Sequence, residues 1–191
     1  MRPKSSSSSY IEKRQVTGMF ADYAHNLAEG LVKTYGRNPA DIAQGLGIKV
    51  IENYDFKKLC GMYTVIKRKR IIFVNGNLSR EMRNTVLSHE LGHDLLHREI
   101  AVNSVVHDVM LYDMTARPEY EANVFAAELL IDDEEIRELT EVYGYDAEQA
   151  AAALGLDVNL VVIKVASMIE RGFDYRGGGI DIDNGFLKGG E

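Results

Sequence analysis

The sequence predicts an α+β domain that is mostly helical and carries a small antiparallel sheet of two to three strands. Apolar residues recur at three- and four-residue spacing over several long segments, as in amphipathic helices. Between Gly47 and Gly76 the pattern changes to short runs of β-branched and aromatic residues. The stretch TVLSHELGHDLLH, which holds three of the chain's five histidines, lies in another strongly helical segment.

The N-terminal part is expected to form two helices. The first covers Tyr10–Tyr35, and Gly36 ends it. Asn38 and Pro39 have the chemistry of an N-cap and a first helical turn, so a shorter helix follows to about Leu46.

Short strands are expected next, and they define the sheet. They lie at Ile48–Ile51, Gly61–Ile66 and Ile71–Val74, and Asn75-Gly76 is a strong turn signal after the last one. The basic run Lys67–Arg70 is interpreted as a solvated turn between two strands. We expect these strands to pair antiparallel.

The second half of the chain is again helical. Helices are expected from Ser79, over Arg117–Ile131, from the acidic run Asp132–Glu135, over Asp146–Leu154 and over Asp157–Ile169. The apolar but irregular stretch Ile100–Met114 gives no assignment.

The composition indicates a soluble protein of a reducing compartment. The single cysteine, Cys60, cannot form an intramolecular disulfide, and no segment resembles a membrane span of about 20 apolar residues. The N-terminus MRPKSSSSSY is followed by no apolar core, so it does not read as a secretory signal. We therefore expect a cytoplasmic protein with no membrane partner, and its oligomeric state stays open.

The charge balance argues against broad attraction to nucleic acid. The chain has 22 basic and 29 acidic residues, a formal net charge of -7, whereas non-specific binding needs a basic surface. The helix-turn-helix-like segment 147–169 offers only Asn159 and Lys164 on its second helix. We expect this segment to pack or to bind a partner protein, and Lys67–Arg70 stays a candidate for a local basic patch.

The segment His89-Glu90-Leu91-Gly92-His93 is an HExxH sequence. Residues four apart lie on one helix face about 6 Å apart, so both imidazoles can reach one zinc ion. Glu90 can then sit beside a metal-activated water as its base. Gly92 is a poor helix former, so its presence inside a helix suggests that another element approaches closely at this position.

A catalytic zinc needs a third protein ligand. His97 lies about 12 Å along the helix from His89, so we expect it to pack at the helix end; His107 stays possible. Glu121 shares the inward edge of an apolar stripe, where a carboxylate is costly unless a cation receives it. The alternative to a metal ligand is a partly solvent-exposed Glu121 that forms an ion pair with Arg117.

Two further glutamates lie on the same predicted helix. Glu119 is the neighbour most easily confused with Glu121. Glu128 lies two turns beyond Glu121, where it can accept a hydrogen bond from a histidine ligand or be exposed.

Together these segments resemble the ImmA/IrrE family of HExxH metallopeptidases. The resemblance covers roughly Asn38 to Ser167 and rests on four segments: NPADIAQGLGIKV, IIFVNGNL, SHELGHDLLH and EYEANVFAAELL. One departure is the run Leu129-Leu130-Ile131-Asp132, where family members often carry a proline after ELL.

The resemblance implies a mini-gluzincin-like zincin with His89, His93 and Glu121 as zinc ligands and Glu90 as catalytic base. It implies cleavage of a partner repressor that carries a helix-turn-helix, which would derepress a mobile element or a stress regulon. A regulator that binds such a repressor without cutting it is the alternative.

We accordingly expect a flexible leader at residues 1–9, one metallopeptidase domain at 10–172 and a glycine-rich tail at 173–191. The group that stabilises the oxyanion is not fixed by the sequence, and Tyr112, Tyr120 and His107 are candidates.

Overall fold

The computed structural model describes residues 6–99, 116–175 and 180. Its helices are α1 (Ser6–Tyr35), α2 (Pro39–Gly45), α3 (Arg80–Leu96), α5 (Arg117–Leu130), α6 (Asp133–Arg137), α7 (Ala147–Leu154) and α8 (Val158–Glu170), with a π-helical turn η1 (Glu138–Val142) after α6. The strands are β1 (Lys49–Asn53), β2 (Gly61–Ile66) and β3 (Lys69–Asn75). The predicted α+β class, mostly helical with one small sheet, is confirmed.

The sheet is mixed, which corrects the expectation of a purely antiparallel one. Its strand order is β1-β3-β2. β2 pairs antiparallel with β3, whereas β1 pairs parallel with β3 in the register Lys49↔Ile71. The chain reverses direction after β1 and again after β2, so β1 and β3 point the same way. Because the sequence does not show that β3 takes the central position, the parallel pair was not predictable from it.

Capping residues and glycines in the sequence predicted most of the helix ends correctly. The side chain of Asn38 accepts a hydrogen bond from the backbone N–H of Ala40, and that of Ser79 accepts one from Met82. Gly36 adopts a φ of +80° directly after α1, a left-handed conformation that favours glycine. The start of α1 was not predicted, because the helix begins at Ser6 and overlaps the expected leader.

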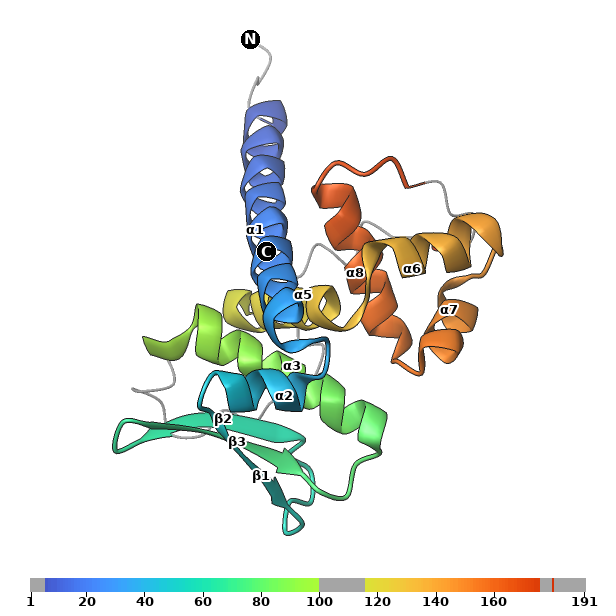
Figure 1. Ribbon diagram of the computed structural model, residues 1–191. Helices are drawn as coiled ribbons and strands as arrows, with labels where there is room; N and C mark the ends of the chain where they lie inside the picture. Colours follow the sequence, from blue (N-terminus) through green and yellow to red (C-terminus); the bar gives the residue numbers. More distant parts are fainter. Residues whose placement is uncertain (1–5, 100–115, 176–179, 181–191) are drawn as a thin grey trace.

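Helix α5 is the central element of the fold. Its residues 121–129 are all buried, so both sides of the helix are covered. On one side Phe125 and Leu129 join a core formed with α1, α2, α3 and the sheet. On the other side Val124 and Ala127 join a core formed with α7 and α8. Figure 1 shows α5 between these two parts, with α3 lying between α5 and the sheet.

Helices α3 and α5 approach each other closely at Gly92. A Cβ atom at this position would lie 3.0 Å from the Cα of Ala122 and 3.3 Å from its Cβ. The expectation that another element approaches Gly92 is confirmed, and that element is α5. This contact brings the HExxH helix within side-chain reach of α5.

Helices α7 and α8 form the bent pair predicted for 147–169. Gly155 joins them with a φ of +66°, and the helices meet at a bend of 109°. Lys164, one of the two side chains considered for DNA reading, is 1% exposed and therefore faces the protein interior. None of the described helices is, by itself, long and apolar enough to cross a lipid bilayer; only the bent pair α7 and α8 reaches that length.

Candidate metal centre

Two histidines of α3 and one glutamate of α5 converge on one point. The Nε2 atoms of His89 and His93 are 3.0 Å apart. Glu119 places Oε2 3.2 Å from the Nε2 of His89, and Oε1 3.5 Å from the Nε2 of His93. The three side chains have ligand atoms within 4.8 Å of one another. The i, i+4 spacing therefore brings the predicted histidine pair together as expected.

The orientation of His89 is set by Asn123 on α5. The Nδ1 of His89 lies 2.8 Å from Oδ1 of Asn123, and both residues are buried. An amide oxygen can only accept a hydrogen bond, so Nδ1 carries the proton and Nε2 keeps its lone pair. That lone pair is the one directed toward His93 and Glu119, which is the form of imidazole that binds a metal.

In the structure Glu119, and not the predicted Glu121, lies beside the histidine pair, so the geometry favours Glu119 as the third ligand. The carboxylate of Glu121 accepts a hydrogen bond from Nε of Arg117 at 2.7 Å and lies 3.2 Å from Nε2 of His97. Glu121 is indeed nearly buried, at 8% exposure. The cation that a buried carboxylate requires is supplied here by Arg117.

The geometry of α5 explains why Glu119, and not Glu121, faces the histidine pair. Glu119 and Asn123 are four residues apart, so they lie on the same helix face, and each contacts one ring nitrogen of His89. Glu121 lies two residues from Glu119, about 200° around the helix axis. The spacing of Glu119 and Asn123 was the signal available in the sequence, because two polar side chains one turn apart can hold one imidazole.

The other residues considered for this site have different positions. His97 caps the end of α3, and its ring centre is 5.9 Å from that of His93, in agreement with the expected packing role. Glu128 is fully buried and accepts hydrogen bonds from Lys164 and Ser167, away from the histidine pair. His107 lies outside the described residues.

The three side chains suit a zinc ion. Zinc bonds of about 2.0–2.1 Å in a tetrahedron place the ligand atoms roughly 3.3 Å apart, and the observed separations are 3.0, 3.2 and 3.5 Å. Burial alone would raise the pKa of Glu119, but the hydrogen bonds and charges of the two histidines outweigh burial and lower it. Two imidazole nitrogens and an ionised carboxylate form the donor set of many catalytic zinc sites.

Glu90 lies beside this cluster with unused hydrogen-bonding capacity. It is fully buried, and neither carboxylate oxygen accepts a hydrogen bond of good geometry from a described residue, although the backbone of Tyr63 lies near enough to lower its pKa. Burial raises the pKa of Glu90 to about 8; the charge of His93 opposes this shift and that of Glu119 adds to it. A buried carboxyl group is costly to leave without a partner. An arrangement of this kind suits a group that exchanges a proton with a bound water.

A glycine on β2 makes room for Glu90. A Cβ atom at Gly61 would lie 3.0 Å from Oε1 of Glu90 and would overlap Cγ1 of Val86. The start of β2 therefore runs directly against the HExxH helix.

Asp94 fixes the last turns of α3 on the sheet. This buried carboxylate accepts a hydrogen bond from the hydroxyl of Tyr63 at 2.6 Å and one from Arg70 at 2.8 Å. Arg98 adds a third contact at 3.2 Å. Since Asp94 follows His93 directly, these bonds hold the histidine in place relative to β2 and β3.

The candidates for stabilising an oxyanion are not brought to the cluster. The hydroxyl of Tyr120 lies 3.3 Å from a carboxylate oxygen of Glu170 on α8, and its ring packs in the core around α8. Tyr112 and His107 lie outside the described residues.

Comparison with known proteins places this arrangement in a family. A profile of the peptidase family M78, described as the IrrE N-terminal-like domain, matches residues 43–166. The chain belongs to this family. The matched range contains α3, α5 and the whole histidine–glutamate cluster, and the family is one of metallopeptidases.

Two relatives are similar over much of the chain. Immunity region protein 2 of Bacillus phage phi105 is 38% identical over 104 residues, which are 54% of this chain and 65% of the phage protein. Metallopeptidase ImmA of Bacillus subtilis strain 168 is 31% identical over 129 residues, which are 65% of this chain and 73% of ImmA. The matched region thus spans just under two thirds of the phage relative. No solved structure matched the chain significantly.

Proposed function

We propose that the protein is a zinc-dependent endopeptidase in which His89, His93 and Glu119 hold the metal and Glu90 is the general base. The observation that carries this proposal is the convergence of three ligand atoms within 4.8 Å, beside a buried carboxylate that accepts no hydrogen bond of good geometry from a described residue. Asn123 supports the site by fixing the imidazole of His89.

In the proposed hydrolysis, the metal and Glu90 would have different roles. When bound, zinc would supply Lewis-acid polarisation of the scissile carbonyl and of a water molecule. Glu90 takes the proton of that water on a carboxylate oxygen and then gives it to the leaving amine. The elevated pKa of Glu90, about 8 without the metal, shows how strongly its environment disfavours the charged form. A nearby cation would bring this pKa down toward the working range of a base.

A polypeptide substrate can pair with the free edge of β2. The carbonyl of Cys60 accepts a hydrogen bond from the N–H of Asn75 at 2.8 Å, so this opposed pair is a hydrogen-bonded one. Hydrogen-bonded pairs alternate along an antiparallel ladder. The peptide groups of Gly61, Tyr63 and Val65 therefore point away from β3, toward an edge that no described strand covers. Since Gly61 adjoins Glu90, a peptide paired there would pass the metal.

We further propose that the substrate is a helix-turn-helix repressor in the cytoplasm, and that its cleavage derepresses a mobile element or stress regulon. The names of the relatives, an immunity region protein of a phage and the metallopeptidase ImmA, support this choice. The helix pair α7–α8 would serve packing or partner binding, because Lys164 is buried.

Metal analysis and cleavage together test the enzymatic proposal. Purified protein should bind close to one zinc per chain, and His93→Ala should lose it. Glu90→Gln should keep the zinc and lose cleavage of a peptide library, because it removes only the base. A chain without stoichiometric zinc would refute the metal site.

Co-expression with a repressor encoded beside the gene tests the substrate. The repressor should disappear with the unchanged protein and persist with Glu90→Gln. If the repressor is inactivated equally by both, the protein acts by binding and not by cleavage.

A further inference from the structure

One end of the sheet carries a cluster of cations that the proposed chemistry does not use. We call it the basic end of the sheet and define it as Lys49, Lys67, Arg68, Lys69 and Arg70. The first four are exposed, and none has a carboxylate within salt-bridge distance among the described residues. The fifth member, Arg70, has such a partner in Asp94. So do six described arginines elsewhere: Arg37, Arg83, Arg98, Arg117, Arg137 and Arg171.

The turn between β2 and β3 presents two of these cations in an unfavourable conformation. Lys67 and Arg68 both have positive φ angles, 50° and 65°, and Ile66 pairs with Lys69 across the turn. A two-residue hairpin turn with two positive φ angles is of type I′, for which Asn-Gly is the favoured pair. Asn-Gly would adopt these two φ angles with less strain than Lys67-Arg68 does. The presence of Lys and Arg at this turn therefore points to a role for their side chains.

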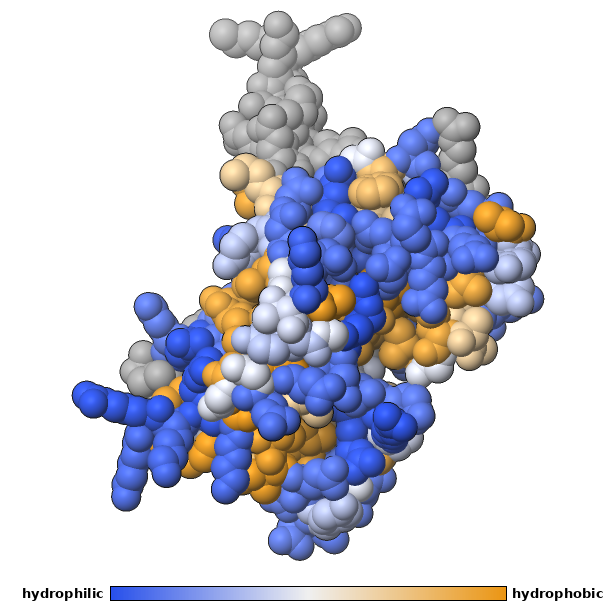
Figure 2. All heavy atoms as spheres, viewed as in Figure 1, coloured by the Kyte–Doolittle hydropathy of each residue, from blue (hydrophilic) through white to orange (hydrophobic). Residues whose placement is uncertain are grey.

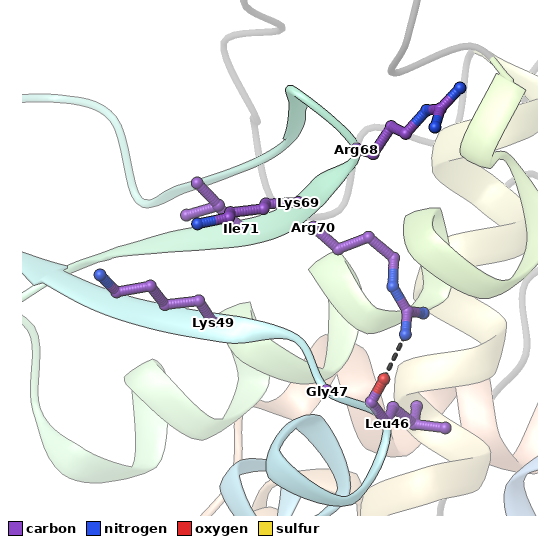
Figure 3. Close-up of a pocket in the computed structure, with 7 residues that line it drawn as sticks. All are labelled: Leu46, Gly47, Lys49, Arg68, Lys69, Arg70 and Ile71. Carbon is purple, nitrogen blue, oxygen red and sulfur yellow. Dashed lines mark hydrogen bonds between the residues drawn. The ribbon is translucent and has the colours of Figure 1, made fainter.

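A hollow lies beside this turn. It has a volume of about 420 Å³ and is lined by Leu46, Gly47, Lys49, Arg68, Lys69, Arg70 and Ile71. Arg70 is held inward by bonds to Asp94 and to the carbonyl of Leu46, whereas no bond joins Lys49, Arg68 or Lys69 to the other residues drawn (Figure 3). Figure 2 shows hydrophilic side chains projecting from the molecule where Figure 1 draws the β2–β3 turn. The hollow therefore offers free positive charge.

The basic end lies on the line that a substrate would follow along β2. Residues 61–66 form β2, with Gly61 at the Glu90 end and Ile66 at the turn. At about 3.4 Å per residue, Ile66 at the turn is roughly 17 Å from Gly61 at the catalytic end. A substrate strand paired antiparallel to β2, the slightly more stable pairing, runs from the turn toward Glu90. Its residues at the turn therefore precede the scissile bond by about four to six positions.

We propose that the basic end of the sheet binds an acidic segment of the polypeptide substrate, located about four to six residues before the scissile bond. This inference rests on the proposed peptidase function. Charge complementarity supports an acidic peptide, since the unpaired cations gather at the end of the substrate strand. A nucleic acid fits less well, because the chain as a whole carries a net charge of -7 and would repel a long polyanion.

Binding of a defined probe tests this surface without requiring catalysis. The probe is a fluorescein-labelled hexaglutamate peptide, and its affinity is measured by anisotropy at low salt with the zinc-loaded Glu90→Gln protein. In that background, Lys67→Asn with Arg68→Gly removes two charges and installs the dipeptide preferred in this turn, so the hairpin is retained. Affinity should fall at least tenfold. Lys33→Asn with Arg80→Gly, which removes the same charge from α1 and the start of α3, should leave it within twofold.

Two binding results would overturn the proposal. One is equal affinity of the turn variant and the unchanged protein for hexaglutamate. The other is tighter binding of a single-stranded oligodeoxynucleotide with the same number of charges, which would assign the surface to nucleic acid.

Cleavage of a proteome-derived peptide library separates this inference from the enzymatic one. The unchanged protein should cut peptides enriched in Asp and Glu before the scissile bond, and the turn variant should lose that enrichment while still cutting other peptides. Cleavage with the same sequence preference in both proteins contradicts the proposal. Absence of cleavage in both counts against the peptidase function alone, and the binding result then decides whether the surface takes acidic peptides.

Discussion

The Nδ1 of His89 and the Oδ1 of Asn123 lie 2.8 Å apart between the two central helices. Through this bond α5 determines which nitrogen of His89 is available to a metal. Asn123 lies four residues after Glu119, so one face of α5 supplies both the proposed third ligand and the residue that orients His89.

Asn123→Leu should weaken zinc binding by roughly 10- to 100-fold, because His89 loses the acceptor that fixes its tautomer and ring orientation. Asn123→Asp keeps an acceptor and should bind zinc nearly as well as the unchanged protein. Competition with a chromophoric chelator measures both affinities. Equal affinities for all three proteins would show that Asn123 does not position His89.

Glu119→Gln and Glu121→Gln should show which of the two neighbouring carboxylates binds zinc. The first removes the proposed carboxylate ligand, whose oxygen lies 3.2 Å from Nε2 of His89, and should lose stoichiometric zinc. The second removes the partner of Arg117 and His97, and it should keep the metal with only a modest loss of stability. Zinc content after exhaustive dialysis distinguishes them. The opposite pattern would restore Glu121 as the ligand.

Gly61→Ala should destabilise the fold by about 1–3 kcal/mol, since the new methyl group meets Val86 and Glu90 in a packed interior. Gly30→Ala is the matched control. A Cβ at Gly30, five residues before the end of α1, meets no atom within 4 Å, so this change should stabilise by up to about 1 kcal/mol. Urea unfolding of the metal-free proteins measures both. A neutral Gly61→Ala would mean that α3 and β2 can move apart.

The ion pairs of Asp133 should make stability fall in acid. Burial alone would raise the pKa of Asp133, but hydrogen bonds from Arg171 and the charge of Lys164 lower it from 3.8 to about 2. Because the folded-state pKa is the lower one, the stabilisation, about 2 kcal/mol, is complete above pH 3.8 and disappears as the pH falls through 2.

The comparison with Asp133→Asn isolates this contribution. The unchanged protein should exceed the variant in stability above pH 4, and the difference should shrink between pH 4 and pH 2, in urea titrations of metal-free protein. A difference that stays constant over this range would assign the effect of Asp133 to packing.

Much of the fold could be predicted because its signals are local. Asn38, Ser79 and Gly36 marked helix ends through capping and backbone conformation that depend on neighbours a few residues away. The histidine pair was equally predictable, since both members belong to one helix and i, i+4 spacing fixes their separation.

What the sequence by itself determined was therefore the element order, the HExxH helix with Glu90 in it, and the need for a carboxylate from a later helix. Only the tertiary structure showed which carboxylate lies beside the histidine pair, and which strand lies at the centre of the sheet. The rotation of α5 against α3 turns Glu119 toward His89 and Glu121 toward Arg117 and His97. That rotation depends on the packing of Gly92 against Ala122, a contact between residues distant in sequence.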